Sequence, residues 1–119
     1  TPFKGKKGLG RLLNAFRYSM DGLVVAYQHE NAFRQEIYLS LLLVPVAIYL
    51  GHTSIDRALM IACVFLVLIV ELINSSIEAV VDRISLDHHL LAKRAKDIAS
   101  AAVFVSLVNL AVVWGIIIF

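Results

Sequence analysis

Two carboxylates and an amide lie inside an otherwise apolar stretch of this sequence, and these groups are the ones best suited to chemistry. Glu71, Asn74 and Glu78 fall in or next to the apolar run 58–81. At about 100° per helical residue, Asn74 lies roughly 60° and Glu78 roughly 20° from Glu71, so all three share one helix face. A carboxylate at membrane depth is costly unless paired, hydrated or protonated, and it therefore indicates a functional site. The alternative is that these groups only join helices by hydrogen bonds.

Two further polar clusters adjoin the other apolar stretches. The first precedes the first stretch and contains Glu30, Arg34 and Glu36. The second precedes the last stretch and contains Asp87, His88, His89, Arg94, Lys96 and Asp97. Carboxylates that bind Mg²⁺, cations that neutralise phosphate charge and a carboxylate that accepts a hydroxyl proton are what phosphoryl transfer requires. Two adjacent histidines without a third spaced partner indicate a transition-metal site only weakly.

The composition of the chain predicts a membrane protein, whose helices would position these polar clusters. Its 119 residues are 60% hydrophobic, with a mean hydropathy of +0.81, which is more apolar than is usual for a soluble domain. Three stretches are expected to be transmembrane helices, each near the length of about 20 residues that a bilayer requires. They cover approximately residues 31–50, 57–81 and 98–119. Pro45 lies inside the first, and membrane helices tolerate proline.

Residues 1–30 are predicted to form a basic arm and an interfacial helix. Apolar residues recur at helical spacing between Leu9 and Tyr27, with Arg11, Arg17 and other polar residues between them. This pattern is typical of an amphipathic helix that lies in the membrane surface, with its basic residues near anionic head groups. The segment Gly5–Gly10 lacks the spacing of a phosphate-binding loop. The sequence therefore predicts an all-α membrane protein with one domain, residues 1–119.

The positive charges predict its orientation. Ten of the eleven Lys and Arg residues lie before the first span or between the second and third, and only Arg57 lies in the Gly51–Arg57 turn. The positive-inside rule then places the N-terminus and the loop 82–97 in the cytoplasm. The acidic face lies at the cytoplasmic end of the second span, so a soluble co-substrate would arrive from that side. Cys63 is the single cysteine, which excludes a disulfide within one chain.

The polar clusters also carry a family resemblance. The run Glu71–Arg83, with Ala32–Glu36 before it and Arg94–Asp97 after it, resembles the prokaryotic diacylglycerol kinase family, and the resemblance extends from about Gly10 to Phe119. It implies a bacterial inner-membrane enzyme that acts as a homotrimer and has no nucleic-acid partner. It also implies that Mg²⁺ and ATP are used to phosphorylate diacylglycerol to phosphatidic acid. Because three helices are few to shield so polar a face from lipid, neighbouring chains are expected to complete the shielding.

The resemblance implies a role for individual residues. Glu71 would be the general base, and Glu30 and Glu78 would bind Mg²⁺. The residues that would contact ATP are Arg11, Tyr18, Glu30, Glu78, Asp87, His88, His89, Lys96 and Asp97. The residues that would contact the lipid are Arg11, Ser19, Ala32, Phe33, Arg34, Gln35, Glu36, Glu71, Asn74 and Ser100. The chain departs from many members at Phe16 and Met20, where a small residue and a Trp are common, so its lipid-binding surface would differ.

Three alternative functions stay open at this stage. Relatives within the same family phosphorylate undecaprenol, although the run Phe33–Glu36 resembles the diacylglycerol branch. A small channel or ion-coupled transporter would use Glu71 and Glu78 as a relay, but three spans are few and no inverted repeat is visible. A non-catalytic membrane subunit would keep its properties when Glu71 is replaced.

Overall fold

The computed structural model describes residues 8–84 and 90–119, and throughout these ranges the regular structure is helical. The helices are α1 (Leu9–His29), α2 (Asn31–Leu50), α3 (Ser54–Ile84) and α4 (Leu90–Ile118). Three of them, α2, α3 and α4, are long and apolar enough to cross a membrane. The predicted all-α membrane fold with one additional N-terminal helix is therefore confirmed.

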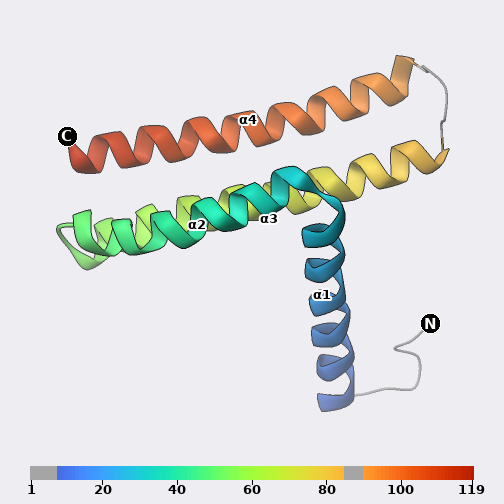
Figure 1. Cartoon of the computed structure of the whole chain (residues 1–119), viewed down its shortest axis with the longest axis horizontal. Helices are drawn as coiled ribbons and strands as arrows, with labels where there is room; N and C mark the ends of the chain where they lie inside the picture. The colour runs from blue at the N-terminus through green and yellow to red at the C-terminus, as the bar shows by residue number, and fades with distance from the viewer. Residues whose placement is uncertain (1–7, 85–89) are drawn as a thin grey trace.

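Helix α1 runs across the direction of the other helices and projects away from them (Figure 1). Its apolar residues, among them Leu12 and Phe16, are exposed along one side, as expected of a helix in the membrane surface. The helix ends because Glu30 adopts an extended conformation, with φ −115° and ψ 105°. Helix α2 begins at the next residue, Asn31. A single residue thus forms the elbow between the interfacial helix and the first spanning helix.

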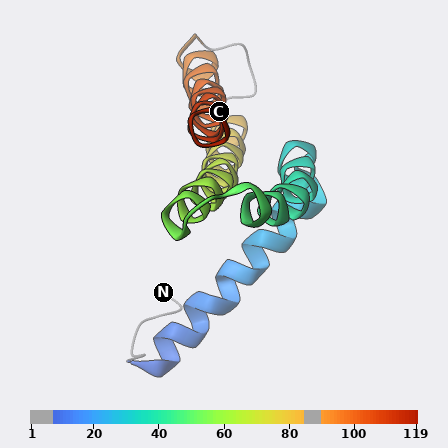
Figure 2. The same cartoon turned by 90° about the vertical axis from the view of Figure 1, so that its left-hand side faces the viewer.

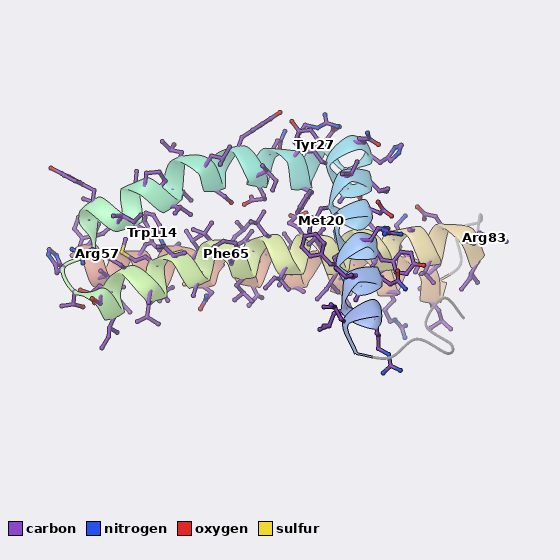
Figure 3. All side chains as sticks on the ribbon, turned by 90° about the horizontal axis from the view of Figure 1, so that it is seen from below. Met20, Tyr27, Arg57, Phe65, Arg83 and Trp114 are labelled. Carbon is purple, nitrogen blue, oxygen red and sulfur yellow. The ribbon has the colours of Figure 1, made fainter. Side chains whose placement is uncertain are left out.

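Helices α2, α3 and α4 run side by side, with α3 between the other two (Figures 1 and 2). The chain extends 47 × 43 × 21 Å. Its main apolar core lies at the end of the layer remote from α1, where Ala47, Met60 and Val64 pack with Trp114. The indole N–H of Trp114 donates a hydrogen bond of 3.1 Å to the carbonyl of Met60. Figure 3 shows Trp114 and Arg57 together at this end.

The connection between α2 and α3 is shorter than the predicted Gly51–Arg57 turn, because α3 begins at Ser54. The hydroxyl of Thr53 accepts a hydrogen bond of 3.1 Å from the backbone N–H of Asp56 and so caps the new helix. Arg57 donates from Nε to the carbonyl of Ile48 at 3.0 Å, which satisfies a carbonyl at the end of α2. These two contacts fix a tight turn.

The predicted loop 82–97 is also shorter than expected. Residues 82–84 continue α3, and residues 90–97 belong to α4. The ammonium of Lys96 donates to Asp82 Oδ1 at 2.9 Å and so links the two helices, while Lys93 pairs with Asp97 at 2.7 Å along α4. Both helices continue beyond the predicted spans because hydropathy marks the limits of the apolar region, whereas a helix can extend past it with charged side chains.

Candidate functional site

The carboxylate of Glu71 is the centre of the candidate site. Its residue is only 6% exposed, although Glu71 belongs to a helix that would cross the membrane. The charges of Glu36 on α2, Glu78 on α3 and Glu30 at the elbow all act on it. The structure therefore brings near one another four acidic residues that are spread over about two fifths of the sequence. A single chain already buries Glu71, while the expectation that neighbouring chains complete the shielding of the whole polar face stays a prediction.

Asn74 lies one helical turn after Glu71 and contacts the next carboxylate. Its Nδ2 donates a hydrogen bond of 3.5 Å to Glu78 Oε1, while its Oδ1 is buried without a hydrogen-bond partner. A buried acceptor without a partner costs about 1–3 kcal/mol, so it indicates a place for water, an ion or a ligand group. Asn74 and Glu78 are partly exposed within the chain.

A cleft of about 620 Å³ separates α1 from α3 and has a size usual for small-molecule sites. Figure 3 shows α1 crossing α3 on this side of the layer. The cleft contains two predicted site residues, Ser19 and Glu30. Its walls are formed by Ser19, Gly22, Leu23, Val25, Ala26, His29, Glu30, Leu72, Ser75, Ser76 and Ala79.

The cleft and the acidic face use neighbouring sides of α3. At about 100° per residue, Ser75 lies roughly 40° and Leu72 roughly 100° around the helix from Glu71, so the cleft wall adjoins the acidic face. His29 and Ser76 were missed by sequence reasoning, although both line the cleft. A signal was present, since the adjacent pair Ser75 and Ser76 is unusual within so apolar a helix, and His29 precedes Glu30.

Several other predicted residues lie outside this cleft. Arg11 and Tyr18 are exposed on α1, Ala32 and Gln35 are exposed on α2, and Ser100 is exposed on α4. Lys96 and Asp97 lie on α4 and are engaged by Asp82 and Lys93, respectively. Phe33 is only 2% exposed and packs within the chain. The predicted ATP contacts Asp87, His88 and His89 fall outside the described residues.

Arg34 contacts the elbow. Its Nε and Nη2 donate hydrogen bonds of 2.9 Å to the carbonyls of Tyr27 and Gln28, and its Nη1 donates to Asn31 Oδ1 at 3.2 Å. The guanidinium carbon also lies 5.4 Å from the ring centre of Tyr27, within cation–π range. The side chain predicted to touch lipid is thus held against the end of α1.

Comparison with known proteins decides the family. Residues 17–118 match the model of the family described as prokaryotic diacylglycerol kinase. The chain belongs to that family. Proteins named diacylglycerol kinase are similar over nearly their whole length: that of Pseudomonas aeruginosa is 53% identical over 98% of this chain and 95% of its own. Those of Haemophilus influenzae and Escherichia coli K12 are 47% and 46% identical, over 94% and 92% of this chain and 95% and 90% of their own.

Membership in the prokaryotic diacylglycerol kinase family identifies the chain as an enzyme, a lipid kinase that transfers phosphate and crosses its membrane several times. The matched range 17–118 contains Glu71, the elbow and the cleft. Of the predicted site residues, Arg11 alone lies outside this range. The cleft beside the acidic face is therefore the candidate active site of a member of this family.

Proposed function

We propose that this chain transfers the γ-phosphoryl group of ATP to the free hydroxyl of diacylglycerol, yielding phosphatidic acid and ADP. The observation that carries the proposal is the buried carboxylate of Glu71 beside a cleft that opens between a surface helix and a spanning helix. A lipid head group that enters from the membrane surface would meet Glu30 in this cleft and Glu71 on the adjoining face of α3. The name shared by the relatives supports diacylglycerol as the acceptor.

In the proposed reaction Glu71 is the general base. It accepts the proton of the lipid hydroxyl while the hydroxyl oxygen forms a bond to the γ-phosphorus. The bond between that phosphorus and the oxygen bridging to the β-phosphate breaks, and ADP departs with this oxygen. Burial keeps Glu71 away from bulk water, so that in the proposed complex the lipid hydroxyl, and not water, would be its proton donor.

We propose that two of these acidic residues hold Mg²⁺, although within residues 8–84 and 90–119 no three or more Asp, Glu, His or Cys side chains gather closely enough to bind a metal ion by themselves. This ion is commonly held by one or two carboxylates, with water and nucleotide phosphates as its other ligands. We assign Glu30 and Glu78 to it, and the unpartnered Oδ1 of Asn74 beside Glu78 supports an additional polar ligand or a metal-bound water at this place. When bound, Mg²⁺ would neutralise charge on the ATP phosphates.

Cationic side chains on α1 and α4 would contact ATP. Lys96 is held by Asp82 and lies close enough to Glu78 for their charges to interact. We assign Arg11, Tyr18, Lys96 and Asp97 to nucleotide binding, together with Asp87, His88 and His89. The lipid side of the site would comprise Ser19, residues 32–36, Asn74 and Ser100.

We further infer that the site faces the cytoplasm of a bacterial cell, where ATP is available. The positive charges support this orientation, because they gather at the end of the layer that carries α1 and the start of α4. We also propose that the active enzyme is a homotrimer. The partial exposure of Asn74 and Glu78 in the single chain supports a neighbouring chain as the cover of that part of the site.

A lipid phosphorylation assay tests the proposed function. The purified chain, in detergent with Mg-ATP, is given diacylglycerol and undecaprenol in parallel, and phosphate in the extracted lipid is measured. Faster phosphorylation of diacylglycerol is expected. Faster phosphorylation of undecaprenol would show that undecaprenol, and not diacylglycerol, is the preferred acceptor. If the folded protein phosphorylated neither lipid, the proposal would be overturned.

A further inference from the structure

The elbow between α1 and α2 is held by side-chain contacts between the two helices. The last four carbonyls of an α-helix have no partner within the helix. Arg34, from the first turn of α2, donates to two such carbonyls of α1, those of Tyr27 and Gln28. Its positive charge also lies at the negative end of the α1 dipole. One side chain therefore caps the preceding helix.

Two aromatic residues brace the same elbow. The rings of Tyr27 on α1 and Tyr38 on α2 meet edge to face, with centres 6.1 Å apart, and their hydroxyls are hydrogen bonded to each other. The guanidinium of Arg34 lies over the ring of Tyr27, which is one member of this aromatic pair. Together with the hydrogen bond to Asn31, the two bonds to backbone carbonyls use three of the five N–H donors of the guanidinium. The contacts come from both helices and hold them at one angle.

This angle decides the geometry of the candidate site. Helix α1 packs mainly against α2, whereas α1 and α3 face each other across the cleft. Glu30 is itself the elbow residue, and its carbonyl accepts the backbone N–H of Arg34 at 3.1 Å. A rotation at the elbow would move Glu30 and the whole α1 wall of the cleft relative to Glu71.

We propose that Arg34 is a positioning residue that locks the elbow and thereby fixes Glu30 and the α1 wall of the cleft opposite α3. The structural part of this inference is independent of the reaction, while its consequence for catalysis rests on the proposed function. The lock depends on the planar fork of the guanidinium, because a lysine ammonium is a single point charge and cannot bridge the same acceptors.

A distance measurement between α1 and α3 tests the lock directly. Cysteines replace the exposed residues Leu13 on α1 and Val80 on α3, spin labels are attached, and the distribution of distances is recorded by pulsed electron resonance. Labelled chains are diluted with unlabelled chains so that distances within one chain dominate. Cys63 is buried, and a chain carrying only this cysteine measures background labelling.

The variants compared are Arg34→Gln and Arg34→Lys, with Arg17→Gln as the matched control. Arg17 is exposed on α1, so its replacement removes the same charge from the membrane surface away from the elbow. A narrow distribution is expected for the parent and for Arg17→Gln, and a broadened or shifted one for both Arg34 variants. The proposal that Arg34 locks the elbow would be overturned if the distance distribution of Arg34→Gln equalled that of the parent. It would also be overturned if Arg34→Lys kept the narrow distribution of the parent.

Kinetics separate positioning from direct contact with lipid. If Glu30 is displaced, kcat should fall roughly ten- to a hundredfold in Arg34→Gln, the scale of small misplacements at active sites, and KM for Mg-ATP should rise. A rise confined to KM for diacylglycerol, with an unaltered distance distribution, would instead make Arg34 a lipid contact. If the parent lacks lipid phosphorylation, the proposed function fails while the distance measurement still decides the lock.

Discussion

At the scale of single residues, the free energy of a buried carboxylate depends on its neighbours. Glu71 is buried, and the carboxylates of Glu30, Glu36 and Glu78 are close enough for their charges to interact with it. Such a group of like charges is unfavourable unless cations, protons or water compensate it. Mg-ATP would bring a metal ion to this place, so the site gains favourable electrostatics when its proposed co-substrate binds.

Replacing Glu71 by Gln should remove the base and keep the shape of the side chain. Turnover is expected to fall by about two orders of magnitude or more, the usual scale for loss of a general base. Helix content and elution volume in detergent should stay those of the parent. A well-folded Glu71→Gln protein with near-normal turnover would contradict the assignment.

Replacing Glu30 or Glu78 by Gln should change the response to Mg²⁺, because each variant loses the charge of one oxygen ligand. Activity is expected to fall, and the Mg²⁺ concentration required for half-maximal activity should rise. The measurement is a Mg²⁺ titration at fixed ATP. Superimposable curves for the parent and both variants would show that neither carboxylate binds the ion.

The hydrogen bond between the hydroxyls of Tyr27 and Tyr38 should make the stability of the elbow depend on pH. The hydrogen bond with Tyr38 raises the pKa of Tyr27 above its ordinary value of 10.0, because ionisation removes the proton that the Tyr27 hydroxyl donates. Since the folded pKa is raised, this contribution to stability is complete below pH about 10 and is lost as the pH rises through the folded pKa. Tyr38→Phe should therefore lower the pKa of Tyr27, as followed by NMR of tyrosine labelled with ¹³C at Cζ. An unchanged titration would contradict the hydrogen bond.

At the scale of elements, short connections hold long helices in place. The turn between α2 and α3 is closed by Thr53 and Arg57 and brings the backbone of Gly51 against the Arg57 side chain. A Cβ at Gly51 would lie 2.5 Å from Arg57 Cγ and 3.0 Å from the carbonyl oxygen of Ala47. Glycine is therefore required here by space, since its φ of −68° is open to any residue.

Gly51→Ala is expected to destabilise the protein by about 1–3 kcal/mol, the usual cost of overpacking. The matched control is Gly115→Ala in α4, where the added Cβ meets no atom within 4 Å apart from the adjoining residues and backbone of its own helix. This control should be neutral or stabilising by up to about 1 kcal/mol, because alanine favours helix. Thermal unfolding in detergent measures both changes. Equal stability of Gly51→Ala and the parent would contradict the close packing of the turn.

At the scale of the whole molecule, the open layer of three spanning helices leaves large apolar side chains exposed. Leu41, Phe65 and Phe104, one from each spanning helix, are more than half exposed. In a membrane these faces contact lipid or another chain. The acidic face differs, because Glu71 is covered by its own chain whereas Asn74 and Glu78 are partly open. A neighbouring chain would complete the site at that place.

Shared sites would allow inactive chains to complement one another. Glu71→Gln chains and Lys96→Leu chains, each inactive alone, are mixed and allowed to exchange in detergent. Kinase activity should reappear if Glu71 and Lys96 of one site come from different chains. The corresponding mixtures with Glu30 and Glu78 variants assign the other residues. Failure of every mixture despite demonstrated subunit exchange would mean that each chain builds its own site.

The sequence by itself determined the helices, the spans and the identity of the acidic face. These properties are local, since periodicity and hydropathy are set by residues within a few turns of one another. It also carried the resemblance to the family, which the comparisons confirm. The ends of the elements were less predictable: Thr53 and the pair Asp82–Lys96 extend α3 and α4 past the apolar stretches.

Only the tertiary structure decided which residues meet. The proximity of Glu36 to Glu71 depends on the packing of α2 against α3. The cleft between α1 and α3 depends on the angle at the elbow. That angle results from the contacts of Arg34 with the carbonyls of α1, together with the pairing of Tyr27 and Tyr38. No periodicity encodes such an angle, because it follows from packing and hydrogen bonding between two helices rather than from the pattern along either one.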